Sequence, residues 1–320
     1  MGIGVLALVR LAAERAAALA AAGYTVREAS TYSSRADALR EAGGSVRAVL
    51  TNGRGGLSAA EMELLPNLEF VCAAGAGYEA IDLAAARKKG IAVANSPDTN
   101  ASAVADSAMM LLMAATRHVL QADRFVRAGG WQDQWRIETP TISGKRLGIV
   151  GMGTIGSRIA QRAARGFDIE VGYHNRSAVP GSPYRYFSGL VALAAWADFL
   201  IASAPGGDRT RHLINADVLS ALGPKGYLVN VGRGTVVDTT ALVDALHSHT
   251  IAGAALDVLE GEPGVPPHLQ TLLTFENVVI TPHVAGRAPE ARAAATALII
   301  RNLDAHFAGE PLPSPVTMKT

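Results

Sequence analysis

Leu147-Gly148-Ile149-Val150-Gly151-Met152-Gly153-Thr154-Ile155-Gly156 is the stretch that decides the fold. Its first four residues are typical of a buried parallel strand, and the pattern G-x-G-x-x-G follows at once. Helix-forming residues without Gly or Pro then run from 157 to 164. The glycines suit a tight turn, the approach of a pyrophosphate and close packing of helix on strand, and the helix N-terminus offers N–H groups to phosphates. We therefore predict a dinucleotide site, the alternative being a plain tight turn.

Composition limits the possible partners. The 320 residues suffice for two domains, and 29 basic against 28 acidic side chains give a net charge of +1. This balance predicts neither nucleic acid nor a membrane surface as partner. Cys72 is the single cysteine, so no internal disulfide can form and a reducing compartment fits. Without an apolar run of membrane-spanning length or a leader pattern, we expect a cytoplasmic protein.

Strand patterns alternate with helix patterns in two series, which predicts parallel sheets covered by helices. The first series has strand patterns at 3–9, 24–28, 46–51, 70–74 and 91–94. The second has them at 147–150, 169–173, 199–203, 227–231, 251–257 and 278–281. The predicted fold class is α/β, with two Rossmann-like, doubly wound domains. The predicted boundaries are 1–96 for the first part of a substrate domain, 97–287 for the dinucleotide-binding domain and 288–320 for a final helix and tail. Periodicity alone does not place that helix.

A long apolar helix is predicted from Ser102 to Ala128, ending at Gly129-Gly130. It is apolar around most of its circumference, which is typical of a helix buried between domains or subunits.

The loop expected to bind the adenosine ribose carries no carboxylate. The second strand of the nucleotide domain ends in Tyr173-His174-Asn175-Arg176-Ser177, where NAD-binding folds normally have an acidic residue on the ribose 2′-hydroxyl. Arg176, with Asn175 and Ser177, suits a 2′-phosphate instead. We predict NADPH in preference to NADH; the alternative is an exposed loop arginine.

Three charged side chains follow apolar strands, where open α/β sheets bind their ligands. Arg233 lies between two glycines in Val231-Gly232-Arg233-Gly234, Glu262 follows Ala255-Leu256-Asp257, and His283 follows Thr281-Pro282. Taken singly, they also fit a surface ion pair, a solvated carboxylate and a hydrogen-bonded loop histidine.

Together with the glycine pattern, V-N-x-x-R-G, L-D-V-x-x-x-E-P and T-P-H-x-A-G occur in an order that resembles the D-isomer-specific 2-hydroxyacid dehydrogenases. The resemblance runs from Gly75-Ala76-Gly77-Tyr78 to Pro313-Ser314-Pro315-Val316 and so covers nearly the whole chain. It implies an active site in the cleft between the two domains, and a final helix that returns to the substrate domain. It also implies that Arg233 binds the substrate carboxylate and keto oxygen, that His283 is the general acid, and that Glu262 stabilises the protonated histidine.

The same resemblance implies the remaining contacts. Asp257 would orient the nicotinamide carboxamide, and the amides of Ala74, Gly75 and Ala76 would bind the substrate carboxylate. No metal is expected. The other implied cofactor-lining residues are Gly151, Gly153, Thr154, Ile155, Gly156, Asn175, Arg176, Ser177, Ala204, Pro205, Thr210, Val231, Gly232, Ala285 and Gly286.

Within the family, the run from His174 to Ser177 is similar to the NADPH-dependent glyoxylate/hydroxypyruvate reductases and 2-ketogluconate reductases. Glu262 excludes the formate dehydrogenase branch, which has glutamine there. Trp131 matches a tryptophan that closes the partner subunit's active site, with ordinary packing as the alternative. The helix 102–128 matches the family's dimer contact, so we expect a homodimer.

The predicted function is NADPH-dependent reduction of a small 2-oxo acid (glyoxylate, hydroxypyruvate or 2-ketogluconate) to the D-2-hydroxy acid. Two alternatives stay open: an NAD-dependent D-2-hydroxyacid dehydrogenase of another substrate, and a non-catalytic, nucleotide-sensing protein similar to a corepressor. Arg54 either contacts the tail of the substrate or points into water.

Overall fold

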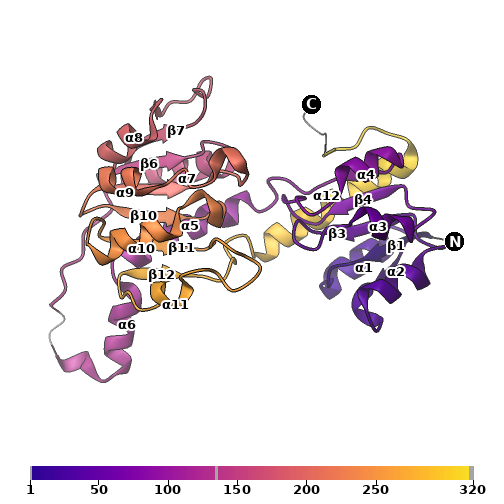
Figure 1. Cartoon of the computed structure of the whole chain (residues 1–320), viewed down its shortest axis with the longest axis horizontal. Coiled ribbons are helices and arrows are strands. Elements are labelled where there is room, and N and C mark those ends of the chain that lie inside the picture. Colours follow the sequence, from indigo (N-terminus) through magenta and orange to yellow (C-terminus); the bar gives the residue numbers. More distant parts are fainter. Residues whose placement is uncertain (1, 134–135, 317–320) are drawn as a thin grey trace. The chain divides into compact units, whose positions relative to one another are not determined.

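A computed structural model describes residues 2–133 and 136–316, and the chain divides into two compact units. Unit 1 is Met1–Asn100 with Ala288–Thr320, and unit 2 is Ala101–Arg287. Each unit contains one parallel sheet, with helices between most of the successive strands (Figure 1). The predicted class of two Rossmann-like α/β domains is confirmed.

Unit 1 has a five-stranded parallel sheet in the order β2-β1-β3-β4-β5. The central strands β3 and β4 are buried along their whole length, because helices cover both faces of the sheet. The strands are β1 (Ile3–Ala7), β2 (Tyr24–Glu28), β3 (Ala48–Thr51), β4 (Phe70–Ala73) and β5 (Ala92–Ala94). The helices are α1 (Ala13–Ala21), α2 (Arg35–Ala42), α3 (Ala59–Glu63), α4 (Leu83–Lys88) and α12 (Pro289–Ala308).

The last helix, α12, belongs to the core of unit 1. Ile299 and Leu303 are fully buried in one apolar cluster with Phe70 and Cys72 of β4. The Tyr24 hydroxyl donates a hydrogen bond of 2.5 Å to Asp304 on the same helix. The beginning and the end of the chain therefore fold as one unit.

Unit 2 has a seven-stranded parallel sheet in the order β12-β11-β10-β9-β6-β7-β8. The strand order reverses between β6 and β9, and open α/β sheets bind ligands at the carboxyl ends of the strands at such a point. The strands are β6 (Arg146–Val150), β7 (Glu170–His174), β8 (Arg185–Tyr186), β9 (Phe199–Ala202), β10 (Tyr227–Asn230), β11 (Gly253–Leu256) and β12 (Val278–Ile280). The helices are α5 (Ala101–Thr116), α6 (Val119–Arg127), α7 (Thr154–Phe167), α8 (Leu190–Trp196), α9 (Ala216–Leu222), α10 (Thr239–His247) and α11 (Leu269–Leu272).

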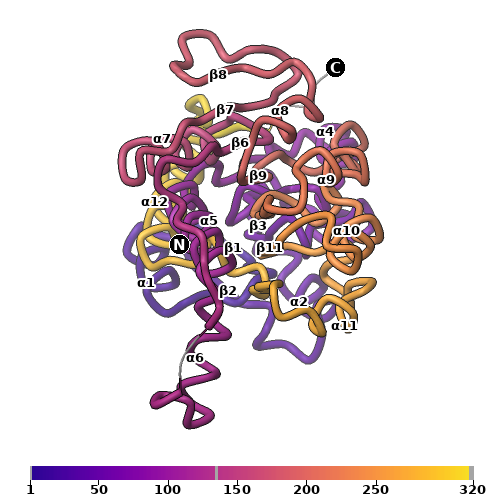
Figure 2. Tube along the Cα trace, turned by 90° about the vertical axis from the view of Figure 1, so that its left-hand side faces the viewer, coloured from indigo at the N-terminus to yellow at the C-terminus, as the bar shows by residue number. Residues whose placement is uncertain are grey.

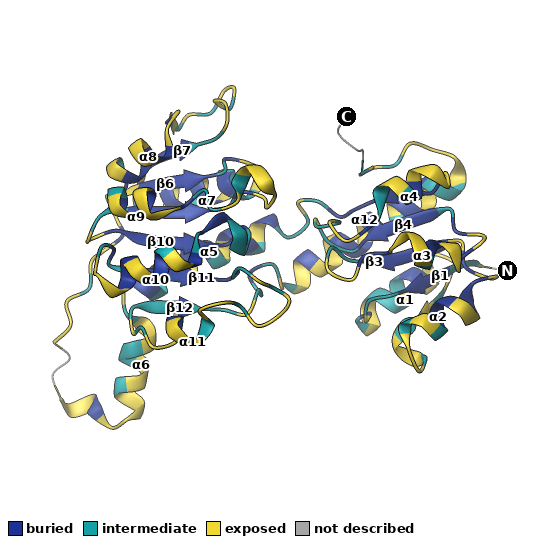
Figure 3. Ribbon diagram, in the orientation of Figure 1, coloured by how far each residue is buried: buried dark blue, intermediate teal, exposed yellow. Residues whose placement is uncertain are grey.

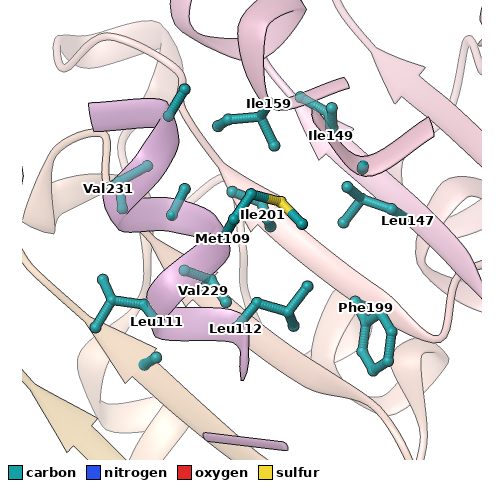
Figure 4. Packing of buried hydrophobic residues seen from close by; sticks show 14 of the residues in the cluster. Met109, Leu111, Leu112, Leu147, Ile149, Ile159, Phe199, Ile201, Val229 and Val231 are labelled. Carbon is teal, nitrogen blue, oxygen red and sulfur yellow. The ribbon is translucent and has the colours of Figure 1, made fainter. Parts of the chain in front are cut away.

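Helix α5 packs across one face of this sheet. Its Met109, Leu111 and Leu112 lie against side chains of β6, β9 and β10, with Ile159 of α7 beside them (Figure 4). This packing buries β6, so the glycine loop that follows it is attached to a strand in the core of the unit.

The prediction of one helix from Ser102 to Ala128 is wrong. The chain forms α5 and α6, which meet at 61°, and His118 between them has a left-handed φ of 50° that no α-helix accommodates. Helix α5 has nine buried residues, whereas α6 has none (Figure 3). Figure 2 also shows α6 leading away from the body of unit 2. The all-round apolar character thus ends near Thr116.

Between residues 2 and 133 and between 136 and 316, no single helix is long and apolar enough to cross a membrane. Helices α5 and α6 taken together reach that threshold only by length and composition.

Candidate active site

The glycine loop after β6 has the geometry of a phosphate-binding turn. Gly151 has a φ of 98°, and a Cβ on it would lie 2.8 Å from the Ala204 backbone at the end of β9. Gly153 caps α7 with open space around its Cα, so a ligand can approach the backbone there. Gly151 and Ala204 therefore meet where the strand order reverses, and the first amides of α7, from Thr154 to Gly156, follow directly.

Asn175 fixes this loop rather than extending away from it. Its Oδ1 accepts a hydrogen bond of 2.7 Å from the Met152 amide, and its Nδ2 donates to the Met152 carbonyl at 3.4 Å. Arg176 and Ser177 come next and are exposed. An exposed arginine beside an anchored loop is a suitable partner for a 2′-phosphate.

Two further predicted cofactor-lining segments are ordered by local contacts. The Thr210 hydroxyl donates to the Pro205 carbonyl at 2.7 Å. Ala204 and Val231, at the ends of neighbouring strands β9 and β10, are both buried.

Asp257 anchors the loop that carries the predicted general acid. This buried carboxylate accepts hydrogen bonds from the Thr281 hydroxyl at 2.5 Å and from the amides of Val284 and Ala285, both at 2.9 Å. The His283 amide donates to the Asp257 carbonyl at 2.8 Å. Residues 281–285 are thus tied to the end of β11 through both the side chain and the carbonyl of Asp257.

His283 and Glu262 form a close pair. His283 Nδ1 lies 2.6 Å from Glu262 Oε2, while Glu262 Oε1 accepts a hydrogen bond of 2.6 Å from the Leu259 amide. With both oxygens engaged, the carboxylate is oriented, and it sets the direction of the imidazole ring.

Arg233 is held by the buried Asn230 at the end of β10. Asn230 Nδ2 donates to the Arg233 carbonyl at 3.0 Å, and its Oδ1 accepts from the Gly232 amide at 3.1 Å. The guanidinium Nη1 of Arg233 donates to the Gly232 carbonyl at 2.9 Å.

The loops of Arg233 and Glu262 pack backbone against backbone. A Cβ on Gly234 would lie 2.0 Å from the Leu259 carbonyl carbon, so only glycine permits this approach. Glu260 ties the second of these loops to a third segment, since its Oε1 lies 2.9 Å from His212 Nε2 and 3.0 Å from Arg211 Nη2. Unit 2 therefore brings Arg233, Glu262 and His283 onto mutually braced loops.

The predicted carboxylate cradle lies in unit 1, after β4. The Ala74 amide is already used, because it donates to the Thr51 carbonyl at 2.8 Å. Among residues 2–133 and 136–316, no acceptor takes the amides of Gly75, Ala76 or Gly77. The available donors are therefore displaced by one residue from the predicted set, and consecutive unpaired amides are typical of an anion site.

Arg54 and Trp131, for each of which the sequence leaves two roles possible, are both exposed. Arg54 follows β3 in a loop whose Arg54 and Gly55 amides donate to Asn52 Oδ1. Trp131 is 77% exposed, which excludes the alternative of ordinary packing within its own unit.

Sequence reasoning missed Asn230, His212 and Glu260 as residues that hold the loops of the site. Asn230 could have been predicted from the sequence, because a polar residue inside an apolar strand predicts a buried hydrogen bond. His212 and Glu260 are 48 residues apart and carry no such signal. In the part of the chain that the structure describes, no cluster of three His, Cys, Asp or Glu side chains could hold a metal ion.

The geometry defines a dinucleotide-binding unit with an arginine, a glutamate and a histidine on adjacent loops. The family model "D-isomer specific 2-hydroxyacid dehydrogenase, NAD binding domain" matches residues 109–285, so the chain belongs to this family of NAD(P)-dependent oxidoreductases. The resemblance inferred from the motifs is confirmed.

Several individual members of this family are similar to the chain over most of its length. The chain is 42% identical to hydroxyphenylpyruvate reductase of Plectranthus scutellarioides, over 85% of this chain and 86% of that protein. It is 40% identical to 2-ketogluconate reductase of Gluconobacter oxydans, with the same coverage. The crystal structure of an NADPH-dependent glyoxylate/hydroxypyruvate reductase from Sinorhizobium meliloti, in complex with citrate, matches 98% of both chains with a TM-score of 0.86 and 36% identity.

Proposed function

We propose that this protein uses NADPH to reduce a small 2-oxo acid to the D-2-hydroxy acid. The observation that carries the proposal is the His283–Glu262 pair at 2.6 Å, beside the loop of Arg233, whose Gly234 packs against Leu259. Relatives that are glyoxylate/hydroxypyruvate and 2-ketogluconate reductases support a substrate of this class.

Each residue of the site would have a separate role in the reduction. Arg233 would bind the carboxylate and the keto oxygen, because a planar set of donors fits two neighbouring oxygens. His283 would give a proton from Nε2 to that keto oxygen, since Nδ1 is engaged by Glu262. The amides after β4 would bind the carboxylate. NADPH supplies the hydride when bound, and the balance is one hydride to carbon and one proton to oxygen.

The nucleotide would lie along the glycine loop, with Asp257, Ala285 and Gly286 near the nicotinamide and Thr154, Ile155 and Gly156 at the phosphates. The preference for NADPH depends on the exposed Arg176 and Ser177. A structure of the Sinorhizobium meliloti reductase in complex with NADP and malonate, 36% identical with a TM-score of 0.84, supports this preference.

The test is a panel of glyoxylate, hydroxypyruvate, 2-ketogluconate and hydroxyphenylpyruvate, each with NADPH and with NADH. We expect turnover of at least one acid, faster with NADPH. Arg176→Ala should lower the ratio of kcat/KM for NADPH to that for NADH about tenfold or more, since a charge-assisted hydrogen bond is lost. The exposed Arg165→Ala is the matched control. Equal rates with both nucleotides in the unaltered protein would refute the preference, and binding of NADPH without any turnover would favour the corepressor-like alternative.

A homodimer through residues 102–128 is part of the same proposal. Val119, Leu120 and Val126 of α6 are 50%, 44% and 43% exposed, which is unusual for so many large apolar side chains on one short helix. Sedimentation velocity should give the mass of a dimer, and a monomer at micromolar concentration would contradict it. A cytoplasmic location stays a prediction from the sequence.

A further inference from the structure

Buried polar side chains gather behind the loop that follows β4. Thr51, Asn95, Ser96, Asn302 and Ser314 are each at most 9% exposed, and all lie in unit 1. A buried polar group lowers stability unless it is paired, so a cluster of them usually serves a defined geometry.

These side chains link the C-terminal tail to β5. Asn302 Nδ2 on α12 donates to Ser314 Oγ at 2.8 Å, and the Ser314 amide donates to Asn302 Oδ1 at 3.2 Å. Ser314 Oγ in turn donates to the Asn95 carbonyl at 2.7 Å, across 219 residues of sequence. The tail also bridges to β5 in antiparallel fashion at Ala94 and Pro315. The position of Asn95 is therefore set by the end of the chain.

Asn95 and Ser96 hold the carbonyls of the loop. Asn95 Nδ2 donates to the Ala76 carbonyl at 2.7 Å, and the Ser96 amide donates to the Gly75 carbonyl at 2.9 Å. In a trans peptide the N–H points opposite to the C=O. Fixing the carbonyls of Gly75 and Ala76 therefore directs the amides of Ala76 and Gly77 away from the buried network. Two glycines make this loop too flexible to keep such an orientation alone.

We propose that Asn95 is a positioning residue, which together with Ser314 of the C-terminal tail aims the Ala76 and Gly77 amides at the carboxylate of the substrate. This inference rests on the proposed function. It assigns the tail a role in the affinity for 2-oxo acids that is separate from nucleotide binding and from proton transfer.

The experiment compares Asn95→Ala, Asn95→Asp and Ser314→Ala with the unaltered protein. Asn67→Ala is the matched control, since its amide donates to the Gly44 carbonyl at 2.9 Å on the exposed surface of the same unit. For each variant, kcat and KM for glyoxylate, the inhibition constant of oxalate and the Kd of NADPH are measured. Circular dichroism checks folding.

Asn95→Ala should raise KM and the oxalate inhibition constant by the same factor, about tenfold, with kcat within about threefold and an unchanged Kd for NADPH. Asn95→Asp should raise both constants further, because it keeps the shape but turns a carboxylate toward the loop. Ser314→Ala should act in the same direction with a smaller effect, and Asn67→Ala should do nothing.

A KM within twofold of the unaltered value in Asn95→Ala would overturn the proposal. So would equal losses in KM, kcat and NADPH affinity, which indicate general loosening. If the unaltered protein turns over no 2-oxo acid, the proposed function fails first. Oxalate binding measured by calorimetry then still decides whether Asn95 shapes an anion site, and equal affinity in Asn95→Ala would refute that.

Discussion

His283 has a backbone conformation that costs free energy, and its neighbours keep it there. Its φ is 54°, in the left-handed region that L-residues avoid at a cost of about 1–3 kcal/mol. The His283 amide donates to the carbonyls of Asp257 and Thr281, and the next amide donates to the Asp257 carboxylate. These bonds fix the backbone of His283, and the contact of Nδ1 with Glu262 orients the ring before any substrate binds, which suits a proton donor.

Glu262→Gln tests the partner of this histidine. Gln keeps the shape of the side chain but removes the negative charge 2.6 Å from Nδ1 of His283, so a charge-assisted contact that orients the ring is lost. We expect kcat for reduction of glyoxylate to fall about tenfold or more, with an unchanged Kd for NADPH. A kcat equal to that of the unaltered protein would show that the two side chains are not coupled.

At the scale of single elements, each unit places buried polar side chains at the carboxyl ends of its strands. Asn230 and Asp257 end β10 and β11 in unit 2, and Thr51 and Asn95 end β3 and β5 in unit 1. Since parallel strands place all these ends on one edge of the sheet, each unit presents one braced edge.

Helix α12 carries a titratable contact with β4. His306 stacks on Phe70 with 5.0 Å between ring centroids, and burial lowers the pKa of His306 below 6.5 although Glu69 lies 3.8 Å away. The unfolded chain therefore takes up the proton more readily than the folded one. The contribution of the packed, neutral His306 to the free energy of unfolding is fully present above about pH 6.5. It is lost as the pH falls below that value.

His306→Gln should remove this dependence. The drop in the free energy of unfolding between pH 7.5 and 5.5, from urea titrations followed by circular dichroism, should be smaller in this variant than in the unaltered protein. His247→Gln, at an exposed position of unit 2, is the control and should leave the drop unchanged. Equal drops in all three proteins would refute the role of His306.

At the scale of the whole molecule, the two units carry separate natural probes. Cys72 is fully buried in unit 1, and burial raises the pKa of its thiol to about 12, so it should react only when unit 1 unfolds. All three tryptophans, Trp131, Trp135 and Trp196, fall within the range of unit 2.

Leu303→Ala should destabilise unit 1 alone. Leu303 of α12 is fully buried beside Cys72, and such a truncation costs about 2–5 kcal/mol. We expect Cys72 labelling to begin at a lower urea concentration, with an unchanged midpoint of tryptophan fluorescence. Leu246→Ala in the core of unit 2 should do the reverse. Midpoints that shift together in both variants would mean that the chain unfolds as a single cooperative unit.

Local patterns predicted most of the fold. Apolar runs located the main strands to within about two residues, and the glycine pattern placed the β6–α7 turn, because these signals lie within one short segment. The bend at His118 was not predictable, since histidine carries no helix-breaking signal of its own. The two-residue strand β8 was also missed, being too short for any periodicity.

The candidate site was predictable in its residue types but not in its bracing. Arg233, Glu262 and His283 follow strands at recognisable motifs, and their roles stay predictions. The hydrogen bonds that brace the loops of each unit, His212 to Glu260 in unit 2 and Ser314 to Asn95 in unit 1, join residues that only the folded chain brings together. No spacing rule in the sequence marks such pairs.

The most direct test of the central claim is His283→Ala, assayed for reduction of glyoxylate and hydroxypyruvate with NADPH and for NADPH binding by fluorescence. We predict that kcat falls about a hundredfold or more, as expected when a general acid is removed, while the Kd of NADPH stays nearly unchanged. A variant that keeps normal kcat on a 2-oxo acid that the unaltered protein reduces would contradict the account.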